Sequence, residues 1–360
     1  GSILCMEEYP KLNSKTDIKS LSLSELENYI ESIGDKKFRA AQLYQWLHEK
    51  LVTDYEQCTN LSKELRGKLE ADTSLTALKP IKVQVSEIDK TAKYLFELWD
   101  GNLIESVLMK YHHGNSVCIS SQVGCRMGCR FCASTLDGCV RNLNPSEMLD
   151  QIYRIQSLSG ERVSNVVIMG SGEPMDNYDN VIKFIELLNS EKGLNISQRN
   201  ITVSTCGIVP RIYELADRNY QITLAISRHA PNDELRKTMM PIANKYSIDE
   251  IMKACQYYIS RTNRRISFEY SLVKGVNDTG ECARQLVNLL SGMNCHVNLI
   301  PVNPIKERDY EQSEHKAIAE FKNKLEKCRI NVTIRREMGR DIDGACGQLR
   351  KNYIDNVDID

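Results

Sequence analysis

The sequence of 360 residues predicts an α/β fold, namely a partial (β/α)6 barrel preceded by a small helical domain and a β-hairpin extension. From residue 116 onward, short apolar segments alternate with longer amphipathic ones, which is typical of βαβ units and a parallel sheet. About six such repeats indicate an open barrel, and in barrels the chemistry lies at the carboxyl ends of the strands.

Residues 1–90 are expected to form the helical domain and residues 91–360 the barrel domain. Ser22 and Glu25 form a capping box that predicts the start of a helix. Further helices are expected near residues 38–47 and 61–69. The lysines and arginines of this region are candidates for contacts with RNA phosphates, although their acidic neighbours favour a solvated helix face on composition alone.

The extension is predicted from apolar or alternating segments that precede the barrel, and Asp100-Gly101 is a hairpin signal between two of them. The first helix of the barrel is expected to start at Asn144-Pro145-Ser146-Glu147, with Asn as N-cap and Pro as first helical residue. Barrel strands are expected near residues 116–121, 163–169, 201–204, 222–226, 266–272, 296–301 and 331–335. Further helices are expected within residues 181–188, 248–259, 283–290 and 316–325.

Composition narrows the class of protein. The chain is 41% hydrophobic and 26% charged, and no stretch approaches the roughly 18 apolar residues of a membrane span. Its 13 cysteines are scattered and follow no secretion signal, so a reducing, cytoplasmic compartment is expected rather than a disulfide scaffold. The net charge of −1 by itself gives no indication of nucleic acid.

The most informative motif is a group of three cysteines on one short segment, Cys125, Cys129 and Cys132. A structural zinc takes four protein ligands, and an ordinary iron–sulfur cubane takes four cysteines. Three thiolates on one loop therefore suit a four-iron cluster that keeps one iron open for a substrate. A zinc site that uses Cys118 or Cys139 as fourth ligand is the alternative.

Two further motifs follow from the residues themselves. Gly172-Glu173 comes directly after an expected strand, where a glycine lets a ligand approach the backbone and a carboxylate can bind an ammonium group. A tight turn is the alternative. Cys346 is flanked by small residues near the end of the chain, so it is more readily exposed than a core thiol. Other cysteines, among them Cys139 and Cys206, are expected to be structural.

The spacing of the three cysteines closely resembles that of radical S-adenosylmethionine (SAM) enzymes. This resemblance implies a [4Fe-4S] cluster bound by Cys125, Cys129 and Cys132, with the open iron holding the amino and carboxylate groups of SAM. It also implies that an electron passed through the cluster yields a 5′-deoxyadenosyl radical. Gly172 and Glu173 are then expected to contact the SAM amino group.

A second resemblance is carried by motifs spread over almost the whole chain, which are similar to those of the RlmN/Cfr family of RNA adenosine methyltransferases. The motifs are Cys118, the three cysteines, Thr135 with Arg141-Asn142-Leu143, Gly172-Glu173-Pro174, Val203-Ser204-Thr205, the 298–303 segment and the Cys346 segment. The resemblance implies two SAM molecules per turnover, one of which methylates Cys346. It further implies that Cys118 is the resolving thiol and Glu105 the proton acceptor, so that a Cys118–Cys346 disulfide forms and must be reduced.

The same resemblance implies further SAM contacts from residues 227–229 and from Ser204 and Asn303. Within the first segment, Ser227 and His229 match the family, whereas Arg228 stands where the family usually has leucine. This departure places a charge at a position that is expected to pack beside the cofactor. Arg228 is nevertheless kept among the expected cofactor-binding residues.

Gly172-Glu173-Pro174 and the Cys132-Ala133-Ser134-Thr135 run resemble the RlmN branch, which methylates adenosine C2 in 23S rRNA and tRNA. That assignment makes residues 1–90 an RNA-binding accessory domain and residues 91–360 a radical SAM catalytic domain with a C-terminal methyl-carrier segment. A flavodoxin-like or thioredoxin-like electron donor, a monomer and no membrane are expected. The alternatives are a Cfr-like C8 methyltransferase of 23S rRNA that confers antibiotic resistance, and a non-catalytic zinc-containing RNA-binding protein.

Overall fold

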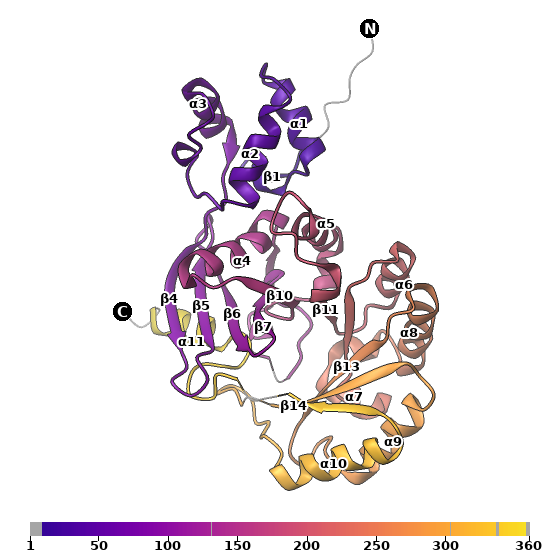
Figure 1. Cartoon of the computed structure of the whole chain (residues 1–360). Helices are drawn as coiled ribbons and strands as arrows, with labels where there is room; N and C mark the ends of the chain where they lie inside the picture. The colour runs from indigo at the N-terminus through magenta and orange to yellow at the C-terminus, as the bar shows by residue number, and fades with distance from the viewer. Residues whose placement is uncertain (1–8, 131, 303, 336–337, 358–360) are drawn as a thin grey trace.

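The computed structural model describes residues 9–130, 132–302, 304–335 and 338–357. A small N-terminal unit lies at one end of a larger α/β unit, and the described part of the chain finishes beside the first strands of the large sheet (Figure 1). The expected order of a helical unit, a hairpin extension and a barrel is confirmed.

The N-terminal unit combines three helices with a small sheet. The capping box of Ser22 and Glu25 opens α1 as expected. The helices are α1 (Leu23–Ser32), α2 (Arg39–His48) and α3 (Lys63–Asp72), and the strands are β1 (Lys11–Leu12), β2 (Lys15–Asp17) and β3 (Thr73–Ser74). The sheet, in the order β1-β2-β3, was not expected, because strands of two or three residues are too short to show an alternating pattern.

The large unit is built on a ten-stranded sheet with the order β15-β14-β13-β12-β11-β10-β7-β6-β5-β4. In chain order, strands β4 to β7 form an antiparallel meander. Strands β7 and β10 to β15 pair in parallel. The strands are β4 (Lys79–Val85), β5 (Ala92–Glu97), β6 (Leu103–Tyr111), β7 (Gly114–Ile119), β10 (Val163–Ile168), β11 (Ile201–Thr205), β12 (Thr223–Ser227), β13 (Ile266–Leu272), β14 (Cys295–Pro301) and β15 (Asn331–Ile334).

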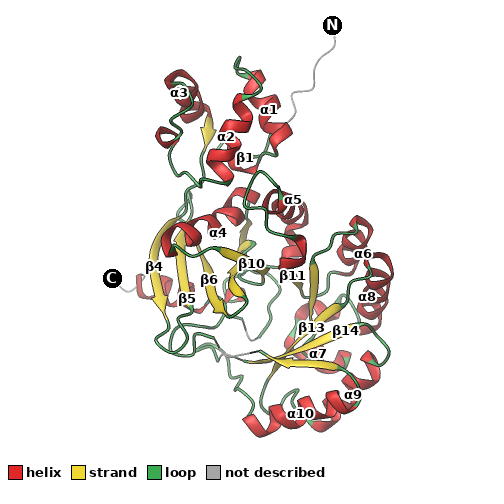
Figure 2. Ribbon diagram, in the orientation of Figure 1, coloured by secondary structure: helices red, strands yellow, loops and turns green. Residues whose placement is uncertain are grey.

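Helices cross over between the parallel strands and cover the outer face of the sheet (Figure 2). Asn144 and Glu147 form the capping box of α4, with Pro145 in its first turn, as predicted. The helices are α4 (Pro145–Ser159), α5 (Tyr178–Asn189), α6 (Val209–Arg218), α7 (Asp233–Met239), α8 (Ile248–Thr262), α9 (Gly280–Leu290), α10 (His315–Lys327) and α11 (Gln348–Val357). None of the helices described here is long and apolar enough to cross a membrane.

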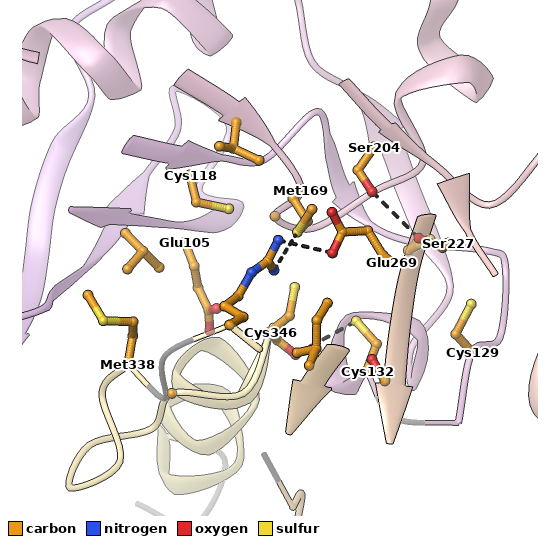
Figure 3. Close-up of a pocket in the computed structure, with 18 of the residues that line it drawn as sticks. Glu105, Cys118, Cys129, Cys132, Met169, Ser204, Ser227, Glu269, Met338 and Cys346 are labelled. Carbon is orange, nitrogen blue, oxygen red and sulfur yellow. Dashed lines mark hydrogen bonds and ion pairs between the residues drawn. The ribbon is translucent and has the colours of Figure 1, made fainter. Parts of the chain in front are cut away.

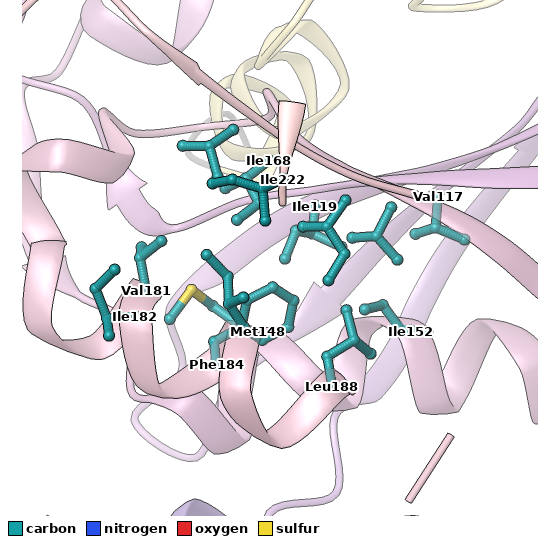
Figure 4. Packing of buried hydrophobic residues seen from close by; sticks show 14 of the residues in the cluster. Val117, Ile119, Met148, Ile152, Ile168, Val181, Ile182, Phe184, Leu188 and Ile222 are labelled. Carbon is teal, nitrogen blue, oxygen red and sulfur yellow. The ribbon is translucent and has the colours of Figure 1, made fainter. Parts of the chain in front are cut away.

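The core lies between the sheet and its covering helices. Met148 and Ile152 of α4 and Phe184 of α5 face Val117 and Ile168 of the central strands (Figure 4), and all five are fully buried. Burial of side chains of this size is worth about 1.5–3 kcal/mol each. The core therefore packs against one face of the sheet, and the opposite face is left to form the candidate functional site.

The boundary expected at residue 90 falls in the turn between β4 and β5, so β4 belongs to the large sheet and not to the helical unit. The N-terminal unit is joined to α4 by buried polar contacts. The ammonium group of Lys19 lies 2.8 Å from an Asp150 oxygen and donates to the carbonyl of Thr76 at 2.6 Å. Both charged side chains are 1% exposed, so neither can replace its partner with water.

Replacing Lys19 by methionine should therefore lower the free energy of unfolding by about 3–5 kcal/mol, because the Asp150 carboxylate stays buried without its partner. Urea unfolding followed by circular dichroism measures the change. Lys37→Met is the control, since the Lys37 side chain is 60% exposed in its ion pair with Glu27 and its loss should cost less than about 1 kcal/mol. Equal effects of the two substitutions would contradict the assigned role of Lys19.

Candidate active site

The cysteine loop follows β7, at the carboxyl end of the first parallel strand, as predicted. Its base is closed by an antiparallel pair, β8 (Gln122–Gly124) and β9 (Cys139–Asn142). The amide of Cys125 donates to the carbonyls of Ser134 and Gly138 at 3.0 and 3.1 Å, which folds the loop back on itself. Gly124 has φ +72°, and a Cβ there would lie 2.1 Å from the Gly138 oxygen, so this close return requires glycine.

A cavity of about 390 Å³ opens beside this loop, within the size range of small-molecule sites (Figure 3). Most of the residues predicted to form the site line it: Glu105, Cys118, Cys125, Cys129, Cys132, Gly172, Glu173, Ser204, Ser227, His229 and Cys346. Arg228 is outside the lining of the cavity, and Asn303 lies outside the described residues. The structure therefore brings together in one space residues that are spread over more than half of the sequence.

The cysteine loop suits a cluster better than a single ion. Among the described residues, no three His, Cys, Asp or Glu side chains converge closely enough to hold one metal ion. Zinc would need such convergence, with each sulfur about 2.3 Å from the metal. In a four-iron cluster each cysteine binds a different iron, so three cysteines of one loop that line the same cavity fit that group. Cys125, Cys129 and Cys132 are the residues that would hold it.

Gly172 and Glu173 lie on the cavity wall after β10. Gly172 has φ +105°, and a Cβ there would lie 2.6 Å from the Cβ of Gln122, so the backbone passes too close for any other residue. The Glu173 carboxylate is 4% exposed and accepts hydrogen bonds from the amides of Cys206 and Met175 and from the Thr205 hydroxyl. Burial raises its pKa, against the opposing effect of these hydrogen bonds. The carboxylate is thus held rigidly at the edge of the cavity.

Ser204 lies near the end of β11 and Ser227 at the end of the neighbouring parallel strand β12, and their hydroxyl oxygens are 3.5 Å apart. His229 follows in a left-handed conformation, with φ +55°. Its Nδ1 accepts the Ser271 amide at 2.8 Å, and burial lowers its pKa to about 3, so the ring is neutral with its proton on Nε2. Buried Arg236 donates to the carbonyls of Cys206 and Arg228, which fixes both segments.

Cys346 is docked between the cysteine loop and the antiparallel strands. Its carbonyl accepts the Ala133 amide at 3.0 Å, and its sulfur lies 3.2 Å from the Ser134 hydroxyl. The next residue, Gly347, donates its amide to Glu105 at 2.8 Å. A Cβ on Gly347 would lie 2.4 Å from the Ser134 nitrogen, so only glycine permits this approach. The thiol is half-buried, partly in line with the exposure expected for it.

Cys118 projects from β7 into the same space as Cys346 (Figure 3). Burial raises its pKa to about 12, and the nearby Cys346 adds to this rise. Contact with Cys132 and burial raise the pKa of Cys346. Both are therefore thiols at neutral pH in this arrangement, and every cysteine in the described part of the chain is free of a disulfide. Cys206, expected to be structural, also lines the cavity.

Several residues of the cavity were not predicted from the sequence. Lys93 on β5 forms an ion pair with Glu105 at 2.9 Å, and both side chains are nearly fully buried. Arg335 pairs with Glu269 at 3.0 Å, and both residues line the cavity. Lys93 lies among alternating strand residues like any surface lysine, so the sequence offered no signal for it.

Arg228 is fully buried on the helix side of β12, away from the cavity. Its guanidinium group contacts the sulfur of Met252 at 3.1 Å and lies 5.8 Å from the centre of the Phe268 ring. Within the described residues its Nε and second terminal nitrogen have no hydrogen-bond partner. Burial lowers its pKa to about 10. The side chain is thus placed for packing, as the usual leucine would be, and does not reach the cofactor cavity.

An open parallel barrel with three cysteines on the loop after its first parallel strand defines a radical SAM enzyme. Comparison with known proteins agrees. The family model of the radical SAM superfamily matches residues 119–289, and that of the ribosomal RNA large subunit methyltransferase N-terminal domain matches residues 16–75. A crystal structure of a radical SAM methyltransferase from Sphaerobacter thermophilus superposes with a TM-score of 0.89 at 41% identity, over 92% of this chain and 98% of that one.

Two curated relatives are similar over nearly their full length, and both are named probable dual-specificity RNA methyltransferase RlmN. The protein of Lachnospira eligens is 73% identical, covering 95% of this chain and 98% of the relative. That of Lachnoclostridium phytofermentans is 64% identical, covering 96% and 97%. The chain belongs to the RlmN family of radical SAM methyltransferases.

Arg228 is buried and forms no ion pair with the residues that the structure describes, so Arg228→Leu should raise the free energy of unfolding by about 1–4 kcal/mol. The lowered pKa of Arg228, about 10, means that the group is charged in both the folded and the unfolded protein below about pH 9. The gain should therefore be constant from about pH 6 to about pH 8.5 and shrink above pH 10, where folded wild-type protein loses the proton. Thermal unfolding at several pH values measures it.

The control is Arg228→Lys, which keeps a buried charge and should bring no gain. A loss of stability on Arg228→Leu would show instead that the guanidinium group has a favourable environment.

Proposed function

We propose that this chain methylates C2 of adenosine in 23S rRNA and tRNA, by means of a methyl group carried on Cys346 and a resolving thiol, Cys118. The observation that carries the proposal is the docking of Cys346. Its sulfur lies 3.2 Å from Ser134 of the cysteine loop, and it shares one cavity with Cys118 and Glu105. A core thiol would need no cavity and no such neighbours.

When bound, the cluster and SAM supply a methyl group and the means of abstracting a hydrogen atom. Cys125, Cys129 and Cys132 are proposed to hold the cluster. Glu173 is proposed to receive the ammonium group of SAM, because its fixed carboxylate follows the Gly172 turn and lines the cavity. Ser204, Ser227 and neutral His229 then offer hydroxyl and N–H groups to the rest of the cofactor. Asn303 is retained as a proposed contact.

The remaining steps follow from the chain's own groups. Adenine C2 carries no lone pair, so a carbon radical on the methylated sulfur of Cys346 is proposed to add to it. This joins enzyme and RNA covalently. Glu105, at the bottom of the cavity, is proposed to accept the C2 proton. Loss of the unpaired electron as well, for which the bound cluster would supply the acceptor, restores the aromatic ring. Cys118 then gives up its thiol proton and attacks the Cys346 sulfur, and the bond from that sulfur to the methylene carbon breaks. This carbon takes up a proton to become the methyl group, so that methylated RNA is released and a disulfide remains.

An external donor must reduce that disulfide and feed the cluster, and we propose a flavodoxin-like or thioredoxin-like protein. The need for free thiols is met in a reducing compartment, so a cytoplasmic location is proposed. A monomer is the simplest assembly. The C8-methylating alternative and the zinc-containing RNA-binding alternative are not favoured by the family to which the chain belongs.

The N-terminal unit is proposed to bind part of the RNA. Phe38 is 54% exposed at the start of α2, and the Arg39 guanidinium group lies 4.5 Å from its ring centre. Lys36 and Lys37 beside them are exposed. An exposed aromatic ring among cations can stack on an unpaired base while the cations contact phosphates.

The direct test is reaction of the reconstituted protein with methyl-deuterated SAM and unmodified rRNA and tRNA, followed by mass spectrometry of the nucleosides. We expect labelled 2-methyladenosine from wild-type protein and none from Cys346→Ala, since no other group is proposed to carry the methyl. Labelled 8-methyladenosine would overturn the C2 assignment, and product from Cys346→Ala would overturn the carrier.

Cys139→Ala is the matched control, because Cys139 is also a half-buried thiol near the cysteine loop but does not line the cavity. It should keep full activity. Cys118→Ala should keep the first methylation of Cys346 but accumulate protein joined to RNA, which gel shift under denaturing conditions detects.

A further inference from the structure

Lys93 occupies an unusual position for a lysine. It is the second residue of β5, is 1% exposed, and points its ammonium group toward the segment that carries Cys346. A lysine this deeply buried is stable only when its charge is compensated and its three N–H groups have acceptors.

The structure provides all three acceptors. The Lys93 nitrogen lies 2.9 Å from a Glu105 oxygen and donates to the carbonyls of Asp343 and Ala345, each at 2.7 Å. One acceptor belongs to the antiparallel strands, and two belong to the segment that leads into Cys346. A single charged group therefore connects the expected base to the expected methyl carrier.

Glu105 is bound to the same segment from its other side. Its two oxygens accept the amides of Gly347 at 2.8 Å and of Arg350 at 2.7 Å, so the carboxylate caps the N-terminus of α11. Negative charge is favourable at that end of a helix. The Lys93–Glu105 pair thus holds the residues on both sides of Cys346. Ala345 bonds to Lys93, and Gly347 bonds to Glu105.

Cys346 itself has two contacts with the cysteine loop, from the Ala133 amide to its carbonyl and between the Ser134 hydroxyl and its sulfur. The side-chain contacts of residues 341–343 are farther along the segment and more exposed. Ser86 bonds to Asp341, and Gln84 bonds to Asp343, from the β4–β5 hairpin. Partly hydrated contacts of this kind contribute less than buried hydrogen bonds to a charge. The Lys93–Glu105 pair is therefore the buried, charged part of the anchor, and it holds the residues on both sides of Cys346.

We propose that Lys93 is a positioning residue: with Glu105 it holds the Cys346 segment so that the sulfur lies against the cysteine loop. The inference rests on the proposed function, because Cys346 is the methyl carrier there. That Lys93 holds the Cys346 segment in place can be tested independently of that function. Lys93 contacts neither the reacting sulfur nor the substrate in this assignment and acts through residues 343–347.

The first test measures the anchor without any cofactor. Lys93→Met keeps most of the side-chain volume but removes the hydrogen bonds from the charged ammonium group to the carbonyls of residues 343 and 345. The amides of Gly347 and Arg350 should then exchange with deuterium about 10- to 100-fold faster. Cys346 should also react faster with iodoacetamide. Exchange of the β13 amides should be unchanged. Unchanged exchange at Gly347 and Arg350 would overturn the proposal.

Lys19→Met is the matched control. Lys19 is likewise 1% exposed, with one carboxylate and one backbone carbonyl as partners, but it joins the N-terminal unit to α4. It should lose comparable stability without changing exchange at Gly347 or the reactivity of Cys346. If Lys19→Met changed both as much as Lys93→Met does, a general loss of stability would be the cause and the positioning role would be wrong.

The second test follows methylation of Cys346 in reconstituted protein, by mass spectrometry of its peptide. In this step the Cys346 sulfur forms a bond to the methyl carbon as the sulfonium bond breaks, S-adenosylhomocysteine leaves and the thiol proton goes to solvent. Lys93→Met should lower the single-turnover rate constant at least about tenfold with the SAM dependence unchanged, and Lys93→Arg, which keeps the donors, should recover part of it.

The outcomes separate the two proposals. If wild-type protein with a full cluster never methylates Cys346, the proposed function fails while the exchange data still decide the anchor. If Cys346 is methylated at the wild-type rate in Lys93→Met, the positioning role is wrong and the proposed function stands. Should Lys93→Met fail to fold, Lys93→Gln takes its place in both tests, with the same expected direction.

Discussion

Parallel pairing of β7 with β10 and the strands that follow is the constraint on which the site depends. Because these strands run the same way, their carboxyl ends meet at one edge, and the loops after them face one another. The cysteine loop after β7, Glu173 after β10, Ser204 near the end of β11 and Ser227 at the end of β12 all reach the cavity for this reason. The covering helices fix the edge but take no direct part in it.

The treatment of buried charge differs between the two faces of the sheet. On the cavity side, Lys93, Glu105 and Glu173 each have partners for their polar groups, so that burial makes them rigid. On the helix side, Arg228 lies against Met252 and Phe268, with two of its nitrogens unpartnered among the described residues. The partnered charges on the cavity side are held in fixed positions, as a functional site requires. The buried charge of Arg228 lowers the stability of the folded protein, as expected for a charged residue that replaces an apolar one in a packed core.

Local signals in the sequence predicted local structure well. The Asn144-Pro145 start of α4, the Asp100-Gly101 turn and the order of strands and helices are confirmed, because each is determined by neighbouring residues. The gathering of the cysteines, Glu173 and the strand-end serines in one place could also be predicted, since parallel strands force it. Contacts such as Lys93 with Ala345 join residues 252 positions apart, and no local pattern records them. For the same reason the burial of Arg228 away from the cavity needed the structure.

The closing wall of the cavity comes from the part of the chain that is made late. Residues 338–347 return to β4, β5 and β6, whereas the cysteine loop and the residues after β10 to β12 precede them along the chain. During synthesis the cysteine loop and strands β7 to β12 emerge from the ribosome before that wall does. A chain halted before Cys346 would hold the cysteine loop and an open cavity, with no sulfur to receive a methyl group. The cavity therefore becomes able to carry a methyl group only when residues 338–347 are in place.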